Sequence, residues 1–112
     1  MSEHQIVLIT AGTQPEAERI AEALVSDRLA ACVTVIPGVT SVYRWQGEVQ
    51  HDQEWLLVAK SRGECLAELM ERVQALHSYE VPEIIALPLV GGSKAYLSWL
   101  DGQVRGRRQA PS

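Results

Sequence analysis

Two long strand-like runs joined by a tight turn occupy residues 28–60, and they constrain the fold more than any other part of the chain. β-Branched and aromatic residues, which favour strands, are concentrated there. Gln46-Gly47 separates the runs as a hairpin turn does, and Pro37-Gly38 interrupts the first run partway. The flanking sequences have helical periodicity. We therefore expect a mixed α+β fold centred on this hairpin.

The first run is too long to lie straight inside a domain of this size. A chain of 112 residues folds to a diameter of roughly 35 Å, whereas residues 28–45 span roughly 55 Å when fully extended. The run must bend at Pro37-Gly38 or project from the domain. Its far half places Val39, Tyr43 and Trp45 on one face, and an exposed aromatic strand invites pairing with another chain. We expect a second copy of the chain to cover it.

Further strands and helices are expected on both sides of the hairpin. A buried strand is expected over 5–11, followed by a helix that begins at Thr13 with Glu16 at capping-box spacing. After the hairpin, the apolar spacing predicts a helix over 64–76. The order of strand and helix thus repeats, which predicts a ferredoxin-like β-α-β-β-α-β sandwich.

The C-terminal part completes this arrangement. A strand is expected over 83–90, in which Pro88 indicates an edge position or a bulge. Ser93 is expected to cap a short helix that ends at Leu100. The length predicts a single domain over 1–112, with an ordered core over about 5–102 and a tail over 103–112.

Composition excludes several classes of protein. The net charge of −4 does not suit a protein that binds the phosphate backbone of nucleic acids. The sequence contains no run of 18 or more apolar residues, so no membrane-spanning helix is predicted. The first residues lack a signal-peptide pattern, and the chain has only two cysteines, so we expect a cytoplasmic protein with free thiols.

The residues that could bind metal are scattered along the chain. They are Cys32, Cys65, His4, His51 and His77, and no two of them have the spacing of a local metal site. We expect Cys32 and Cys65 to be structural thiols, and His77 to be either a helix-end residue or a ligand. No nucleophile–base motif, phosphate loop or metalloprotease helix is present, so we do not expect an enzyme.

Several segments resemble the CutA divalent-cation tolerance family. They are RLAACVTVIPGVTSVYRWQGEV, the strand that ends in Lys60, HSYEVPEIIALPL and YLSWL, and the resemblance covers about residues 5–100. It implies a ferredoxin-like fold and a tight homotrimer like that of the PII signalling proteins. It also implies a role in tolerance of copper and other divalent cations, with no assigned catalytic reaction.

The resemblance also bears on metal binding. Some family members have a cysteine in the first strand and a pair of histidines near the second helix, positions suggested for copper. Here Ile9 and Leu76 stand at two of these positions, and only His77 remains. His77 is thus the expected metal ligand, for a weakly bound divalent ion such as copper or zinc.

The family's motifs imply a polar pocket between subunits, formed by Lys60, His77, Tyr79 and Glu83 with Trp45 nearby. His77 and Glu83 could hold a divalent metal, and Lys60 could hold an anion. The alternative is that Glu83 pairs with Lys60 and His77 only ends a helix. The expected function is a trimeric metal-response or PII-like binding module. The alternatives are a regulatory trimer that binds a small molecule or anion and has no direct metal role, and an unidentified enzyme.

Overall fold

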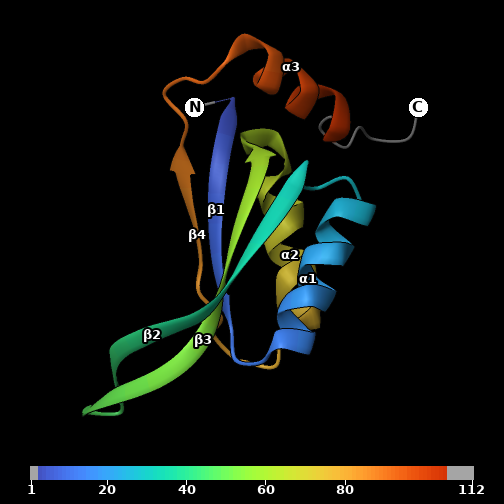
Figure 1. The fold of residues 1–112 in the computed structure, drawn as a ribbon. Coiled ribbons are helices and arrows are strands. Elements are labelled where there is room, and N and C mark those ends of the chain that lie inside the picture. Colours follow the sequence, from blue (N-terminus) through green and yellow to red (C-terminus); the bar gives the residue numbers. More distant parts are fainter. Residues whose placement is uncertain (1–2, 106–112) are drawn as a thin grey trace.

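A four-stranded antiparallel sheet forms the centre of the computed structural model, which describes residues 3–105 (Figure 1). The strands lie in the order β2-β3-β1-β4. The elements are β1 (His4–Ala11), α1 (Gln14–Ser26), β2 (Cys32–Trp45), β3 (Glu48–Arg62), a 3₁₀ turn (Gly63–Cys65), α2 (Leu66–Leu76), β4 (Ile84–Pro88) and α3 (Lys94–Gln103). This order confirms the predicted ferredoxin-like fold, and β4 is the edge strand that Pro88 indicated.

The core lies between the sheet and helices α1 and α2, which cover one face (Figure 1). Alternate residues of the central strands point toward the helices and are fully buried, among them Ile9 and Leu57. Ile20 of α1 and Leu69 of α2 meet them from the helix side. Thr13 caps α1 as predicted, because its hydroxyl accepts the Glu16 N–H at 3.4 Å. No helix in residues 3–105 has the length and apolar character to cross a bilayer.

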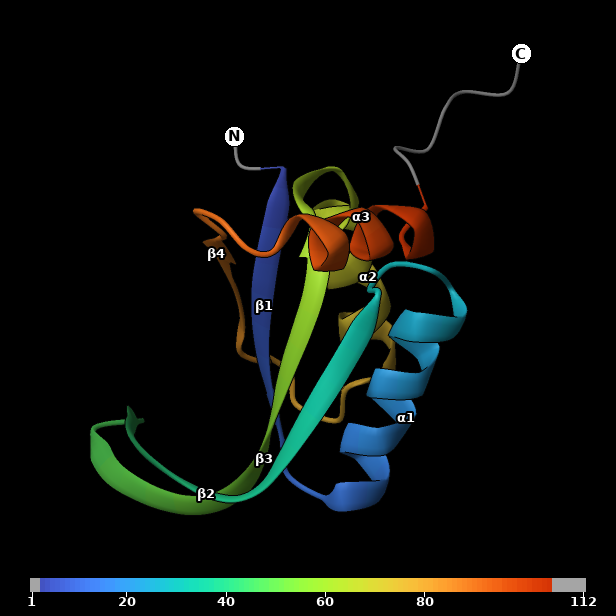
Figure 2. The same cartoon turned by 45° about the horizontal axis from the view of Figure 1, so that its top comes forward.

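The opposite face of the sheet is apolar and is only partly covered. Residues directly opposite in the strand register share a face, so Val58, Leu8 and Ile85 form one row across β3, β1 and β4. Ile85 is 50% exposed and Leu87, from the next row, is 47% exposed. Helix α3 lies across one end of the sheet only (Figures 1 and 2). A wide apolar surface is therefore left without a partner in the single chain.

The β2–β3 hairpin both bends and projects, which resolves the two alternatives left by its length. The register shifts between Ile36 and Val39, where β2 has one more residue than β3. Gly38 lies there with φ +69°, and Gln46 and Gly47 also have positive φ in the terminal turn. Beyond the bulge the hairpin curves away from the domain (Figure 2). The longest dimension is accordingly 47 Å.

The first residues of the expected tail over 103–112 do not form a tail but pack against the domain. Helix α3 continues to Gln103, and Val104 is only 5% exposed. The N–H of Arg105 donates to the carbonyl of Arg28 at 2.9 Å, and its side chain pairs with Glu68. These contacts hold residues 103–105 against the domain, because a backbone hydrogen bond and an ion pair act together. The remainder of the expected tail, 106–112, lies outside the described residues.

The bulge generates a prediction for Gly38. An alanine there must adopt a left-handed backbone, so Gly38→Ala should lower the free energy of unfolding by about 1 kcal/mol. Gly91→Ala is the matched control, because its φ is ordinary and its added Cβ would also meet nothing within 4 Å. Urea unfolding at one protein concentration measures both. Equal stability of the two variants would show that the bulge does not depend on glycine.

Candidate functional site

A pocket of about 610 Å³ lies where the projecting hairpin meets the end of the sheet. The residues that line it come from β1, from the far half of the hairpin and from the segment before β4. They are Thr10, Ser41, Val42, Tyr43, Trp45, Asp52, Glu54, Tyr79, Glu80, Val81 and Glu83. The pocket is therefore built from three segments that are distant in the sequence.

The bulge in β2 decides which side chains face this pocket. Ile36 pairs with Leu56 and Val39 pairs with Glu54, so three positions on β2 correspond to two on β3. A one-residue slip moves every later side chain to the other face of a strand. After the bulge, Tyr43 and Trp45 accordingly lie on the same face as Glu54. Pro37 and Gly38 thus position the aromatic residues of the pocket.

The lining of the pocket is acidic. Four carboxylates line it, those of Asp52, Glu54, Glu80 and Glu83, and no lysine, arginine or histidine does. No three of these carboxylates bring oxygen atoms within 4.8 Å of one another in the described part of the chain. The pocket suits a positively charged group, but the single chain does not present a compact set of direct metal ligands there.

Tyr79 is held tightly at the wall of the pocket. Its hydroxyl donates to Glu54 Oε2 at 2.8 Å, and its N–H donates to His77 Nδ1 at 3.1 Å. A Cβ on Gly12 would lie 2.7 Å from the Tyr79 hydroxyl, so only glycine leaves room for the ring. Burial first, and then the hydrogen bond to Glu54, raise the pKa of Tyr79 well above its usual value. The phenol therefore stays neutral and remains a donor.

Tyr43 makes a similar contact on the hairpin, with Asp52. Its hydroxyl donates to the Asp52 carboxylate, and this hydrogen bond is the main reason why the pKa of Tyr43 is raised. Each of the two phenols in the lining thus donates to one carboxylate. Because both donors are already used within the protein, the carboxylates dominate what the pocket offers to a ligand.

His77 does not lie in the pocket as a metal ligand would. Its side chain is fully buried, and its Nε2 lies 2.7 Å from the carbonyl of Thr10, which can only accept. The ring is therefore protonated at Nε2, and Nδ1 accepts from Tyr79. Both nitrogens are engaged in this geometry. His77 ends α2 and its ring fixes the Tyr79 backbone. This arrangement is closer to the helix-end role expected as the alternative than to the role of a metal ligand.

The other predicted residues divide into two groups. Tyr79, Glu83 and Trp45 do line one pocket. Lys60 does not line it, and its ammonium instead donates to the Thr34 hydroxyl at 3.1 Å on the open face of the sheet. Glu83 therefore has no Lys60 partner among the pocket residues, and the anion-binding arrangement is not assembled within one chain.

Sequence reasoning missed Asp52 and Glu54. Both lie on β3 opposite the aromatic run, since Ser41 pairs with Asp52 and Val39 with Glu54. Counting back from the Gln46-Gly47 turn gives both pairs, because the register runs unbroken from Trp45–Glu48 to Val39–Glu54 and shifts only beyond Glu54. The signal was therefore present in the sequence, in the position of the turn and the number of residues that follow it.

A family model, curated proteins and solved structures that are similar to the chain all carry the same family name. The model of the CutA1 divalent ion tolerance protein family matches residues 5–103. The Divalent-cation tolerance protein CutA of Thermus thermophilus is 55% identical over 96 residues, which cover 86% of this chain and 93% of that protein. A solved Thermus thermophilus structure has a TM-score of 0.90 at 52% identity, and covers 91% of this chain and 99% of its own.

Two further relatives have names that give a location. The structure of the periplasmic divalent cation tolerance protein CutA of Archaeoglobus fulgidus has a TM-score of 0.88 at 40% identity, and covers 91% of this chain and 99% of its own. The chloroplastic CutA protein of Arabidopsis thaliana is 46% identical over 89% of this chain. The chain spans only 55% of that plant protein's length. Proteins of this kind therefore occur in more than one compartment.

The contact between Glu54 and Tyr79 generates a prediction on pH. A phenol whose pKa is raised by folding contributes stability that is complete below about pH 10 and is lost at higher pH. Glu54→Gln removes the charge that the phenol faces, so the pKa of Tyr79 should fall but stay above its usual value, because burial remains. Alkaline titration of phenolate absorbance, with Tyr79→Phe as the difference reference, measures this. Tyr96 of α3 is the control, because its hydroxyl lies beside Cys32 Sγ at 3.4 Å and its transition should not move. An unmoved Tyr79 transition would contradict the assignment.

Proposed function

The chain belongs to the CutA1 divalent ion tolerance protein family, and from that membership we propose that it acts in the response to divalent metal ions. It does so as a binding module that assembles as a homotrimer. The ligand site is the acidic pocket at the hairpin. The observation that carries this proposal is the lining of four carboxylates without a basic side chain.

The homotrimer is supported by the apolar surface of the single chain. Trp45 is 53% exposed on the hairpin, and Ile85 and Leu87 are about half exposed on the sheet. Monomeric proteins rarely leave apolar patches of this extent in water. Copies of the same chain are the partner that a projecting hairpin and an open sheet face both require. A threefold assembly is what the family resemblance implies.

The charge of the pocket supports a cationic ligand. An anion would need a basic group, and Lys60 lies on the sheet face instead. Carboxylate and neutral phenol oxygens suit hydrated hard divalent ions such as Mg²⁺ or Mn²⁺ better than copper, which prefers nitrogen and sulfur. We therefore assign the pocket to a hydrated divalent cation, with water completing its coordination shell.

Binding rather than catalysis is the proposed role. The pocket lining contains the hydroxyls of Thr10 and Ser41 but no histidine that could activate either of them as a nucleophile. We place the protein in the cytoplasm, because Cys32 and Cys65 are both free thiols. Cell fractionation tests that location, since relatives with the names periplasmic and chloroplastic exist.

The assignment of the pocket as the cation site predicts where Mn²⁺ binds. The paramagnetic ion should broaden the ring NMR signals of Tyr43 and Tyr79, which line the pocket. The double variant Asp52→Asn, Glu83→Gln should need about tenfold more Mn²⁺ for the same broadening, because half of the carboxylates are gone. Glu18→Gln, Glu22→Gln on α1 removes the same charge away from the hairpin pocket and should behave like the wild type. Equal broadening in all three proteins would remove the pocket as the cation site.

A further inference from the structure

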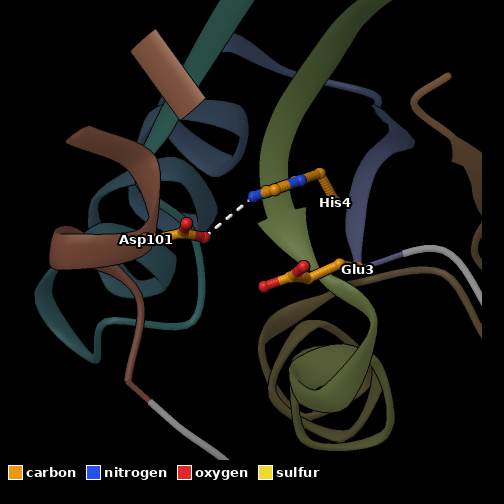
Figure 3. Close-up of side chains that lie close together, drawn as sticks. All are labelled: Glu3, His4 and Asp101. Atoms are coloured by element: carbon orange, nitrogen blue, oxygen red, sulfur yellow. Dashed lines mark hydrogen bonds and ion pairs between the residues drawn. The ribbon is translucent and has the colours of Figure 1, made fainter. Parts of the chain in front are cut away.

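A second group of potential metal ligands lies at the other end of the sheet, where the first strand meets the last helix. His4 is the first residue of β1, Glu3 directly precedes it, and Asp101 is on α3 (Figure 3). One ligand atom from each lies within 4.8 Å of the other two. In Figure 3 the His4 ring points at the Asp101 carboxylate, and the Glu3 carboxylate lies beside it. The fold brings these groups together across almost the whole length of the chain.

We propose that Glu3, His4 and Asp101 bind a borderline divalent cation such as Zn²⁺, which joins β1 to α3. One imidazole nitrogen with two carboxylates is a donor set that Zn²⁺ accepts, and water completes such sites. This site goes beyond the hairpin pocket, whose donors are all oxygen. It gives the chain a place for a metal with nitrogen preference, which His77 does not offer.

The spacing of the donor atoms fits such an ion. Metal–nitrogen and metal–oxygen bonds near 2.1 Å place neighbouring ligand atoms about 3.0–3.4 Å apart. His4 Nε2 and Asp101 Oδ1 are 2.8 Å apart, so a slight opening admits the ion between them. His4 is well shielded, with 15% of its side chain exposed, whereas Glu3 is 60% exposed. Glu3 is therefore the ligand that moves inward.

The same place already attracts a positive charge. The Arg62 guanidinium lies 2.7 Å from Glu3 Oε1 and 3.4 Å from Asp101 Oδ1. Its fit is imperfect, because Nε is buried without a hydrogen bond among the described residues although Glu64 Oε1 lies 3.3 Å away. An entering ion can displace the guanidinium from the two carboxylates, and Glu64 remains as its partner. The two carboxylates that the guanidinium contacts are themselves 60% and 39% exposed, so these ion pairs are weak and are readily exchanged.

Calorimetric titration with Zn²⁺ tests the site on the full chain. The wild type should bind one ion per chain. His4→Gln and Asp101→Asn should each bind about tenfold more weakly or worse, because each loses a ligand. Glu71→Gln, an acidic residue on α2 outside the cluster, should match the wild type. Arg62→Met should bind several-fold more tightly, because the competing cation is gone. Undiminished binding in Asp101→Asn and His4→Gln would overturn the proposal.

NMR of the three histidine rings gives a readout that does not depend on variants. Zn²⁺ should shift the ring signals of His4 and leave those of His51 and His77 in place. A shift at His77 instead would overturn the proposal and restore the ligand expected from the sequence. The test is also separate from that of the pocket, since Asp52→Asn, Glu83→Gln should leave the Zn²⁺ shift of His4 unchanged.

Discussion

The pairing of β2 with β3 is the constraint on which the rest of the structure depends. The two strands have 14 and 15 residues, and paired strands of that length cannot lie straight within a domain of this size. Near the helices the hairpin supplies half of the sheet, with Leu57 and Ala59 in the core. Beyond the bulge it leaves the domain. The pairing of these two strands therefore produces both part of the hydrophobic core and an exposed apolar surface.

The two ends of the sheet present different chemistry. At the hairpin end, the extra residue in β2 turns Tyr43 and Trp45 toward the Asp52 and Glu54 carboxylates, and Gly12 leaves room for the Tyr79 hydroxyl. The donors there are oxygen atoms that suit hard cations. At the other end, α3 brings Asp101 to His4 and adds a nitrogen donor. The proposed cation site at the hairpin and the proposed Zn²⁺ site at α3 therefore differ in the kind of ion that their donors suit.

Local sequence patterns were sufficient for the fold but only partly for the site. The Gln46-Gly47 turn, the Thr13 cap and Pro88 at the edge each depend on neighbours in the chain, so the elements could be predicted. Contacts between distant residues could not. His4 and Asp101 are 97 residues apart, and the buried ring of His77 depends on the carbonyl of Thr10. The C-terminal residues looked like a tail because the residues that bury Val104 are distant from it in the sequence.

The central claim is that copies of the chain cover the far half of the hairpin and the open sheet face. Light scattering of the purified protein at micromolar concentration tests it most directly, with Trp45→Ala measured beside the wild type. The account predicts a mass three times the 12.4 kDa of one chain and partial dissociation of the variant on dilution, because a buried interface aromatic can contribute about 2–4 kcal/mol. A stable wild-type monomer of 12.4 kDa would contradict it.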